Sequence, residues 1–120
     1  MTQNIFETAL DKNGVNYQAL SPIGFLARSA TVYPERVAVI HGARRLTYTQ
    51  VFERSRRLAS ALQRIGIGIG KGSTVSVMAA NIPAFLEAHF GVPASGAVLN
   101  TVNTRLDDET LAYILGREGE

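Results

Sequence analysis

The chain has 120 residues, with 12 Lys and Arg against 10 Asp and Glu, so its formal net charge is +2. This small surplus of positive charge does not indicate a nucleic-acid partner. The absence of cysteine excludes disulfides, a thiol nucleophile and cysteine-ligated zinc. The first residues lack the pattern of a signal peptide, and no window has the roughly 18 apolar residues of a membrane-spanning helix. We therefore expect a cytoplasmic protein without an integral membrane segment.

The amino-terminal residues predict an arm followed by a folded unit. Residues 1–20 show no sustained period and predict an extended arm. Ser21 is a good helix cap and Pro22 suits the first helical position, so a helix is expected to begin there and to end at Pro34. We therefore divide the chain into an arm, residues 1–20, and a folded part, residues 21–120.

A β-hairpin is predicted next. Residues 36–42 (RVAVIHG) form a β-rich run, residues 43–45 (ARR) a turn, and residues 45–48 (RLTY) a second short strand. Thr47 and Gln50 then have the spacing of a capping box, which predicts that a helix follows the hairpin directly.

The helix after the hairpin has a distinct apolar face. Leu46 and Val51 stand where a hydrophobic staple places its two members. Apolar residues on one face follow, at Val51, Leu58, Ala59, Leu62 and Ile65. The basic residues of this segment are Arg54, Arg56, Arg57 and Arg64. We favour a solvated face for them, with contact to an anion as the alternative.

The second half of the chain alternates strands and helices. Residues 73–80 predict a buried strand, Asn81 a cap for a helix that opens at Ile82 and Pro83, and residues 96–103 the next strand. Pro93 is expected to kink or end the intervening helix. Asp107 is expected to cap a last helix bearing Leu111, Ala112, Ile114 and Leu115. This order predicts an α/β fold with a β-hairpin and βαβ units in a mostly parallel sheet.

The sheet is predicted to be incomplete. Residues 116–120 (GREGE) stand where another strand is due. We therefore expect Leu111, Ile114 and Leu115 to be under-covered, and the isolated chain to be marginally stable or prone to aggregate.

Four alternating glycines in residues 64–77 (RIGIGIGKGSTVSV) invite comparison with phosphate-binding loops. The triphosphate pattern G-x-x-x-x-G-K-[ST] fails because Ile65 takes the first glycine position and Gly72 the Ser/Thr position. The dinucleotide pattern fails because Lys71 replaces the third glycine and a helix precedes the loop, so that helix carbonyls face it. We predict that Gly66 ends the helix in a left-handed conformation, that the other glycines form a turn, and that Lys71 lies in solvent.

Other catalytic patterns are missing from the sequence. The two histidines, His41 and His89, have no carboxylate at ligand spacing, so no metal site is predicted, and His41 is expected to be structural. Glu87 and His89 are two apart on one helix and do not face each other, which argues against an acid–base pair. No serine lies in G-x-S-x-G or S-x-x-K. We therefore assign no catalytic, cofactor-binding or metal-binding residue.

One polar cluster follows a predicted parallel strand, at the carboxyl end where α/β sheets place their ligands. It comprises Asn100, Thr101, Asn103, Thr104 and Arg105. The interpretation that we favour is that these groups satisfy the loop backbone and cap the next helix; ligand binding is the alternative.

Two long stretches together resemble a known family. Residues 16–62 (NYQALSPIGFLARSATVYPERVAVIHGARRLTYTQVFERSRRLASAL) and residues 81–106 (NIPAFLEAHFGVPASGAVLNTVNTRL) are similar to the start of adenylate-forming enzymes, especially acyl-CoA synthetases (AMP-dependent synthetases and ligases). Residues 46–48 (LTY) and residues 96–105 match the first two core motifs of that family. The likeness covers about residues 4–117.

The resemblance implies a fold and a reaction. The fold is the N-terminal portion of the large adenylation domain of these enzymes. In the reaction, the carboxylate of a fatty or aromatic acid attacks the α-phosphate of ATP to give an acyl-adenylate and pyrophosphate, with Mg²⁺ neutralising charge. CoA thiol then displaces AMP to give the acyl-CoA. Several functional motifs of the family lie beyond residue 120. They are the phosphate-binding loop, the adenine- and ribose-binding motifs and the catalytic lysine. The resemblance therefore implies that this piece alone binds no cofactor and is inactive, and that the rest of its own domain covers the sheet.

Two other functions stay open. The chain could be a stand-alone, non-catalytic protein that binds a partner through its incomplete sheet. A nucleotide-binding oxidoreductase is disfavoured because it depends on the glycine loop alone. The sequence does not indicate which acid is activated, nor the oligomeric state.

Overall fold

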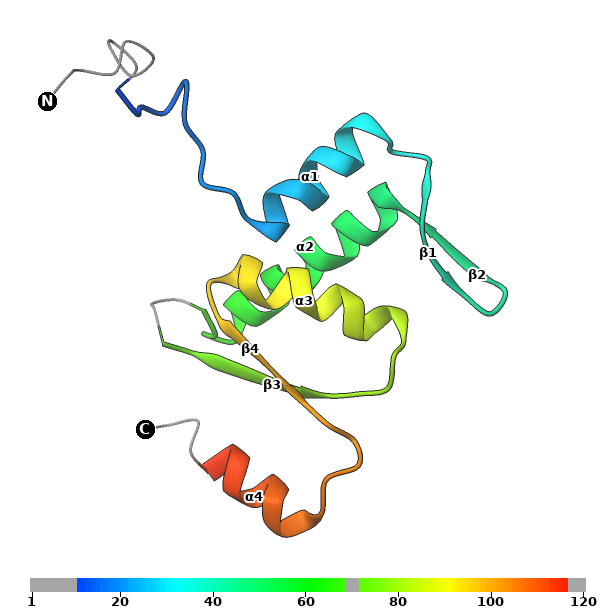
Figure 1. Ribbon diagram of the computed structural model, residues 1–120, viewed down its shortest axis with the longest axis vertical. Helices are drawn as coiled ribbons and strands as arrows, with labels where there is room; N and C mark the ends of the chain where they lie inside the picture. Colours follow the sequence, from blue (N-terminus) through cyan, green and yellow to red (C-terminus); the bar gives the residue numbers. More distant parts are fainter. Residues whose placement is uncertain (1–10, 69–71, 117–120) are drawn as a thin grey trace, which may run out of the picture.

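The computed structural model describes residues 11–68 and 72–116 (Figure 1). Its elements, in chain order, are α1 (Pro22–Val32), β1 (Val37–His41), β2 (Arg44–Thr47), α2 (Tyr48–Arg64), β3 (Thr74–Met78), α3 (Pro83–Ser95), β4 (Val98–Val102) and α4 (Asp108–Gly116). Within these residues, β1 pairs antiparallel with β2 and β3 pairs parallel with β4. The predicted α/β fold, with a hairpin followed by a parallel βαβ unit, is confirmed.

The helix starts follow from local hydrogen bonding. Ser21 Oγ accepts the N–H of Gly24 at 3.2 Å and so caps α1. At α2 the capping box is complete: Gln50 N–H donates to Thr47 Oγ1 at 3.3 Å, and Thr47 N–H donates to Gln50 Oε1 at 2.9 Å. These bonds satisfy N–H groups that the first turn of a helix leaves without an intrahelical partner. Both predicted caps are confirmed.

The ends of the hairpin and of α2 differ from the prediction. The turn lies at Gly42, whose φ is +57°, and the next residue, so that Arg44 and Arg45 belong to β2. Glycine adopts a left-handed backbone conformation at little cost because it has no Cβ. The turn therefore forms at Gly42, ahead of Arg44 and Arg45. Ile65 is 71% exposed because α2 ends at Arg64, before the apolar face reaches it.

The second half also differs from the prediction in its details. The N-cap of α3 is Ile82, without a side-chain cap, so the prediction that Asn81 caps this helix is wrong. The helix does not end at Pro93 but continues to Ser95, so only two helical residues follow the proline and its missing N–H costs one intrahelical hydrogen bond. β3 is half-buried rather than buried, and Met78 at its end is 55% exposed.

Two apolar clusters hold the elements together. The first joins Leu26 of α1, Leu46 of β2 and Val51 of α2, which confirms the predicted staple between Leu46 and Val51. The second joins Leu62 of α2 to α3 and the sheet; its other members include Ala88, Val92, Ala97, Val75, Val77 and Leu99. α2 and α3 approach closely because Gly91 has no side chain: a Cβ there would lie 2.7 Å from Leu58 Cδ2.

The parallel strands lie between two layers of helix. In Figure 1, β3 and β4 cross in projection although they are hydrogen-bonded neighbours, so the sheet is seen nearly edge-on. α2 and α3 lie on one side of the strands and α4 on the other. No residue of α4 is buried, and Leu115 is 44% exposed, so the predicted under-covering of the last helix is confirmed.

The arm precedes α1 as an exposed segment. Residues 11–20 contain a turn but no helix or strand, and each of their side chains is exposed. The boundary between arm and folded part at residue 20 stays a prediction. Of the helices that the structure describes, none is long and apolar enough to cross a bilayer.

Candidate functional site

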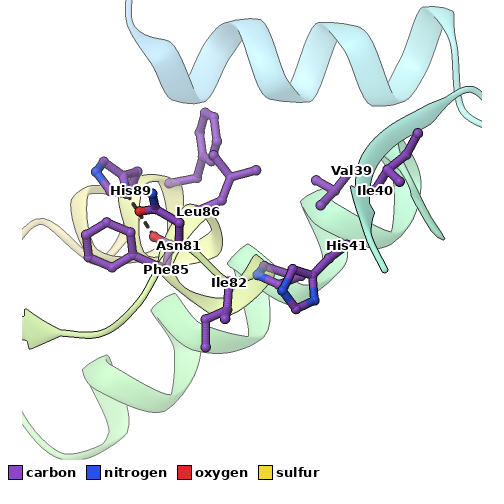
Figure 2. Close-up of a pocket in the computed structure, with 10 residues that line it drawn as sticks. Val39, Ile40, His41, Asn81, Ile82, Phe85, Leu86 and His89 are labelled. Atoms are coloured by element: carbon purple, nitrogen blue, oxygen red, sulfur yellow. Dashed lines mark hydrogen bonds between the residues drawn. The ribbon is translucent and has the colours of Figure 1, made fainter. Parts of the chain in front are cut away.

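Two neighbouring grooves lie at the carboxyl ends of the parallel strands. A polar groove of about 360 Å³ is bordered by the residues after β3 and by the end of β4. An apolar groove of about 530 Å³ lies between β1 and the start of α3 (Figure 2). Asn81 and Phe85 line both grooves. Asn81 therefore stands at a boundary between two surfaces instead of capping α3.

Part of the predicted polar cluster lines the polar groove. Thr101, Asn103 and Thr104 line it, whereas Asn100 lies within β4 and donates to Ser76 Oγ at 3.3 Å. Asn103 Oδ1 accepts the N–H of Arg105 at 3.0 Å. This bond confirms, for Asn103, the prediction that the cluster satisfies loop backbone.

The cap of α4 comes from outside that cluster. Asp107 accepts the N–H of Thr110 at 2.9 Å and its hydroxyl at 2.8 Å. The backbone bond and then the hydroxyl bond lower the pKa of Asp107 below the ordinary value for aspartate, because both stabilise the carboxylate. The predicted cap at Asp107 is confirmed, and the cluster before it has no part in this cap.

The two histidines line the same groove. Their separation in the sequence gave no indication that they would lie near each other. His41 and His89 line the apolar groove from opposite walls in Figure 2. His89 Nδ1 lies 2.8 Å from the carbonyl oxygen of Phe85, so Nδ1 carries the proton, since a carbonyl only accepts. Its ring packs edge-on against the ring of Phe85, with centroids 5.0 Å apart. His41 is exposed at the end of β1, so it has no place in the core.

Glu87 points away from both grooves. It is 6% exposed, and its carboxylate accepts a hydrogen bond from Arg54 Nε at 2.6 Å. This bond, with the attraction between the charges, raises the pKa of Arg54. The prediction that Glu87 and His89 do not form an acid–base pair agrees with this arrangement. Of the basic residues predicted to lie on a solvated face, Arg54 is only half-buried and also contacts Glu87, whereas Arg56 and Arg57 are exposed.

The pairing of Arg54 with Glu87 was missed because the two residues are 33 positions apart. A signal exists in the helix itself. Ala84 and Gly91 lie three positions before and four after Glu87, so the three share one helix face. Small residues on one face indicate close helix packing, and a carboxylate between them needs a partner on the neighbouring helix.

The glycine run is a structural turn in the part that the structure describes. Gly66 has φ +85°, its N–H donates to Gln63, and Ile67 N–H donates to Leu62, which is a complete Schellman motif. Gly68 has φ +83°, and a Cβ there would collide with the carbonyl of Ser95. The run therefore ends α2 and fits against the end of α3. Gly70 and Lys71 lie outside the described residues.

The described residues contain no cluster of metal-ligating side chains. Magnesium prefers carboxylate oxygens, and no group of three or more His, Cys, Asp or Glu in residues 11–68 and 72–116 could hold a metal. The described glycines follow a helix carboxyl end, whose carbonyls repel phosphate. No step with ATP is therefore assigned to these side chains.

Comparison with known proteins decides the family. The profile of the AMP-binding enzymes matches residues 26–119, which is most of the chain. The chain belongs to the AMP-binding enzyme family. It is 54% identical over 107 residues to an acetate–CoA ligase of Humulus lupulus and 56% identical over 106 residues to a peroxisomal acetate/butyrate–CoA ligase of Arabidopsis thaliana.

The family match concerns one part of longer enzymes. The two matches cover 89% and 88% of this chain but 18% of each relative, so the chain spans less than a fifth of their length. The fold is similar to that of a Rhodopseudomonas palustris protein assigned as a long-chain fatty-acid–CoA ligase, with TM-score 0.74 and 32% identity. That match covers 81% of this chain and 24% of the other. The chain thus has a fold found within the N-terminal domains of adenylate-forming enzymes, as predicted.

Proposed function

We propose that this AMP-binding chain is the first part of an acid–CoA ligase, which activates a carboxylic acid with ATP and transfers the acyl group to CoA. The identity of 54–56% over nearly nine-tenths of the chain to acetate– and acetate/butyrate–CoA ligases carries the proposal. In the proposed reaction the carboxylate attacks the α-phosphate, pyrophosphate leaves with Mg²⁺ neutralising its charge, and the CoA thiol then displaces AMP. Adenylation makes the reaction possible because AMP is a far better leaving group than oxide.

A chimera tests this proposal. In this chimera, the matched portion of the Humulus lupulus acetate–CoA ligase is replaced by this chain. Formation of the CoA thioester is then assayed with acetate, butyrate and an aromatic acid in turn. We expect the chimera to form a thioester with at least one of these acids. A chimera that folds and binds ATP but forms no thioester with any of them would contradict the proposal.

The chain by itself is proposed to be inactive and free of bound cofactor. Support comes from the described residues, which offer neither a phosphate loop nor a group of metal ligands. The test is ATP–pyrophosphate exchange with the purified 120-residue chain and each acid. Exchange above the background of a heat-denatured sample would overturn the proposed inactivity.

A second candidate is a stand-alone protein that binds a partner. Exposed apolar side chains on the sheet favour it, because Met78 and Val98 are 55% and 59% exposed. Reading the gene past codon 120 separates the two functions. An open frame with a family phosphate loop supports the ligase, and a stop codon supports the partner-binding protein.

The cytoplasm is the proposed location, with a role in fatty acid metabolism. The Arabidopsis relative is described as peroxisomal, so the peroxisome is the location to test against. Fluorescence microscopy of the full-length gene product, tagged internally, distinguishes the two compartments. A punctate signal that coincides with a peroxisomal marker would overturn the cytoplasmic assignment.

A further inference from the structure

Charge is unevenly distributed between the two halves of the described chain. Residues 21–68 carry eight arginines and two glutamates, whereas residues 72–116 carry one arginine and four acidic residues. With histidine neutral, the part from α1 to α2 therefore has a net charge of +6 and the part from β3 to α4 one of −3. Charge separated in this way produces a surface potential that attracts partners of the opposite sign.

Much of the positive charge lies on the exposed face of α2. Four exposed residues follow one another at intervals of three or four positions and so form one row along the helix: Glu53, Arg57, Ser60 and Arg64. Arg56 lies beside this row and lines, with its first three members, a groove of about 280 Å³. These five residues are called the arginine face of α2 below.

The rest of α2 is already in use. Its buried residues, which include Val51 and Leu62, pack in the two apolar clusters, and Arg54 is paired with Glu87. The five residues of the arginine face are all polar or charged, so burying them would remove hydration without burying apolar surface. We therefore expect this face to stay in contact with solvent in a longer enzyme.

The two central arginines are held in place by their neighbours. The Arg56 guanidinium lies 5.7 Å from the centroid of the Phe52 ring, and Phe52 packs against the first apolar cluster. Arg57 Nη2 lies 3.8 Å from Glu53 Oε2. An exposed pair at this distance is weak, so Arg57 is able to bind a second carboxylate at little cost.

We propose that the arginine face of α2 is a docking surface for an acidic helix of a protein partner, with carboxylates seven residues apart. Arg57 and Arg64 are seven residues apart, which is about 10 Å along a helix axis. Carboxylates at i and i+7 of a partner helix have the same spacing. Side chains on one face of an extended strand recur about every 7 Å and would not match it. Guanidinium groups bind carboxylates through two parallel hydrogen bonds.

Glu53 makes this surface selective for a helix over other anions. A polyphosphate would bring dense negative charge close to this carboxylate, which repels it. A helix avoids the repulsion by placing a lysine or arginine four positions from the carboxylate that faces Arg57. An anionic membrane fits less well, because the arginine face offers no apolar side chain for insertion among lipids.

A designed peptide tests the proposal. The probe is a fluorescent, alanine-rich helical peptide with a lysine and two glutamates at the spacing that matches Glu53, Arg57 and Arg64. A second peptide has the same composition with these three residues on different faces. We expect the matched peptide to bind the 120-residue chain about fivefold tighter by fluorescence anisotropy, and the difference to shrink as salt is raised. Equal binding of the two peptides would overturn the proposal.

Variants separate the arginine face from net charge. Replacing Arg57 and Arg64 by glutamine is expected to reduce binding of the matched peptide to the level of the scrambled one. The matched control replaces Arg44 and Arg45, exposed on the hairpin, by glutamine and is expected to change binding by less than about twofold. If the two pairs of substitutions weaken binding equally, only net charge matters and the proposal is wrong.

A charge reversal guards against misfolded variants. Arg57→Glu is expected to weaken the matched peptide, and a peptide with lysine in place of the facing glutamate is expected to restore binding. A variant that binds neither peptide while its circular dichroism is unchanged would contradict the assigned contact. The peptides are also tested on the folded chimera, and binding to the chain but not to the chimera would show that the face is covered in the longer enzyme and overturn the proposal.

Other occupants give different results. The proposal is overturned if vesicles of anionic phospholipid, ATP or CoA bind the chain more tightly than the matched peptide and lose binding when Arg57 and Arg64 are replaced. It is also overturned if sedimentation shows that these two arginines drive self-association, because a second copy then occupies the face. None of these readouts uses catalysis. Peptide binding together with an inactive chimera would refute the proposed ligase activity and leave the docking surface standing.

Discussion

Arg54 Nε lies 2.6 Å from Glu87 Oε1, which joins α2 to α3 through a carboxylate that is almost wholly buried. The arginine side chain is 39% exposed and the glutamate side chain 8%. The pair therefore stands at the border between solvent and the helix interface. Its glutamate needs a partner there, because an unpaired buried charge is costly.

Arg54→Ala is expected to destabilise the chain by about 1–3 kcal/mol, less than for a fully buried pair because the arginine is partly solvated. The matched control is Arg57→Ala, which removes the exposed pair with Glu53 at 3.8 Å and is expected to cost about 0.5 kcal/mol or less. Urea unfolding followed by circular dichroism measures both. If the two substitutions lowered the free energy of unfolding by the same amount, burial of Glu87 would not explain the stabilisation by its ion pair.

Gly68→Ala is expected to destabilise the chain by about 2–4 kcal/mol, because the new methyl group meets the Ser95 carbonyl in a left-handed conformation. Gly66→Ala is the control: Gly66 is also left-handed, but a Cβ there meets no atom within 4 Å, so a cost of about 1 kcal/mol is expected. Urea midpoints of the two variants give the comparison. If Gly68→Ala were no less stable than Gly66→Ala, the close approach of Gly68 to the Ser95 carbonyl would be ruled out.

The cap of α4 is expected to weaken in acid. The lowered pKa of Asp107 means that its carboxylate is stabilised in the folded state. This stabilisation is present above the pKa of an unfolded aspartate, about 3.9, and is lost as the pH falls through the lower folded value. Exchange of the Thr110 amide should therefore accelerate below about pH 4, beyond the intrinsic pH dependence of exchange.

Asp107→Asn supplies the control for that measurement. Asparagine keeps an acceptor oxygen for the Thr110 N–H but does not titrate. Protection of the Thr110 amide in this variant is expected to be independent of pH over the same interval. An identical acid transition in both proteins would assign the effect to another group.

The isolated chain is expected to unfold over a broad range and to aggregate. Its Cα radius of gyration is 18.7 Å, against about 14 Å for a compact domain of this length, and α4 buries no side chain. Differential scanning calorimetry and light scattering measure both properties. A sharp, reversible transition of a soluble monomer would contradict the expectation. Leu115→Lys should reduce aggregation without lowering the melting temperature, because Leu115 is 44% exposed.

Much of the local structure was predictable because neighbouring residues determine it. Ser21, Thr47 and Asp107 cap their helices through bonds to residues three positions away, and Gly66 ends α2 through bonds to the preceding turn. Such interactions depend on backbone geometry that a few residues fix. The prediction failed at Asn81, where Ile82 takes the cap position, and at Arg44, which belongs to β2 because the turn forms at Gly42.

The sequence by itself determined the helix boundaries set by caps, the order of strands and helices, and the resemblance to adenylate-forming enzymes. Only the tertiary structure decided that Arg54 meets Glu87, that Gly68 fits against Ser95, and that His41 and His89 line one groove. It also decided that α4 lies on the opposite face of the sheet from α3 (Figure 1). These relationships join residues far apart in the chain, and they depend on the packing of whole helices and strands, which local preferences do not specify.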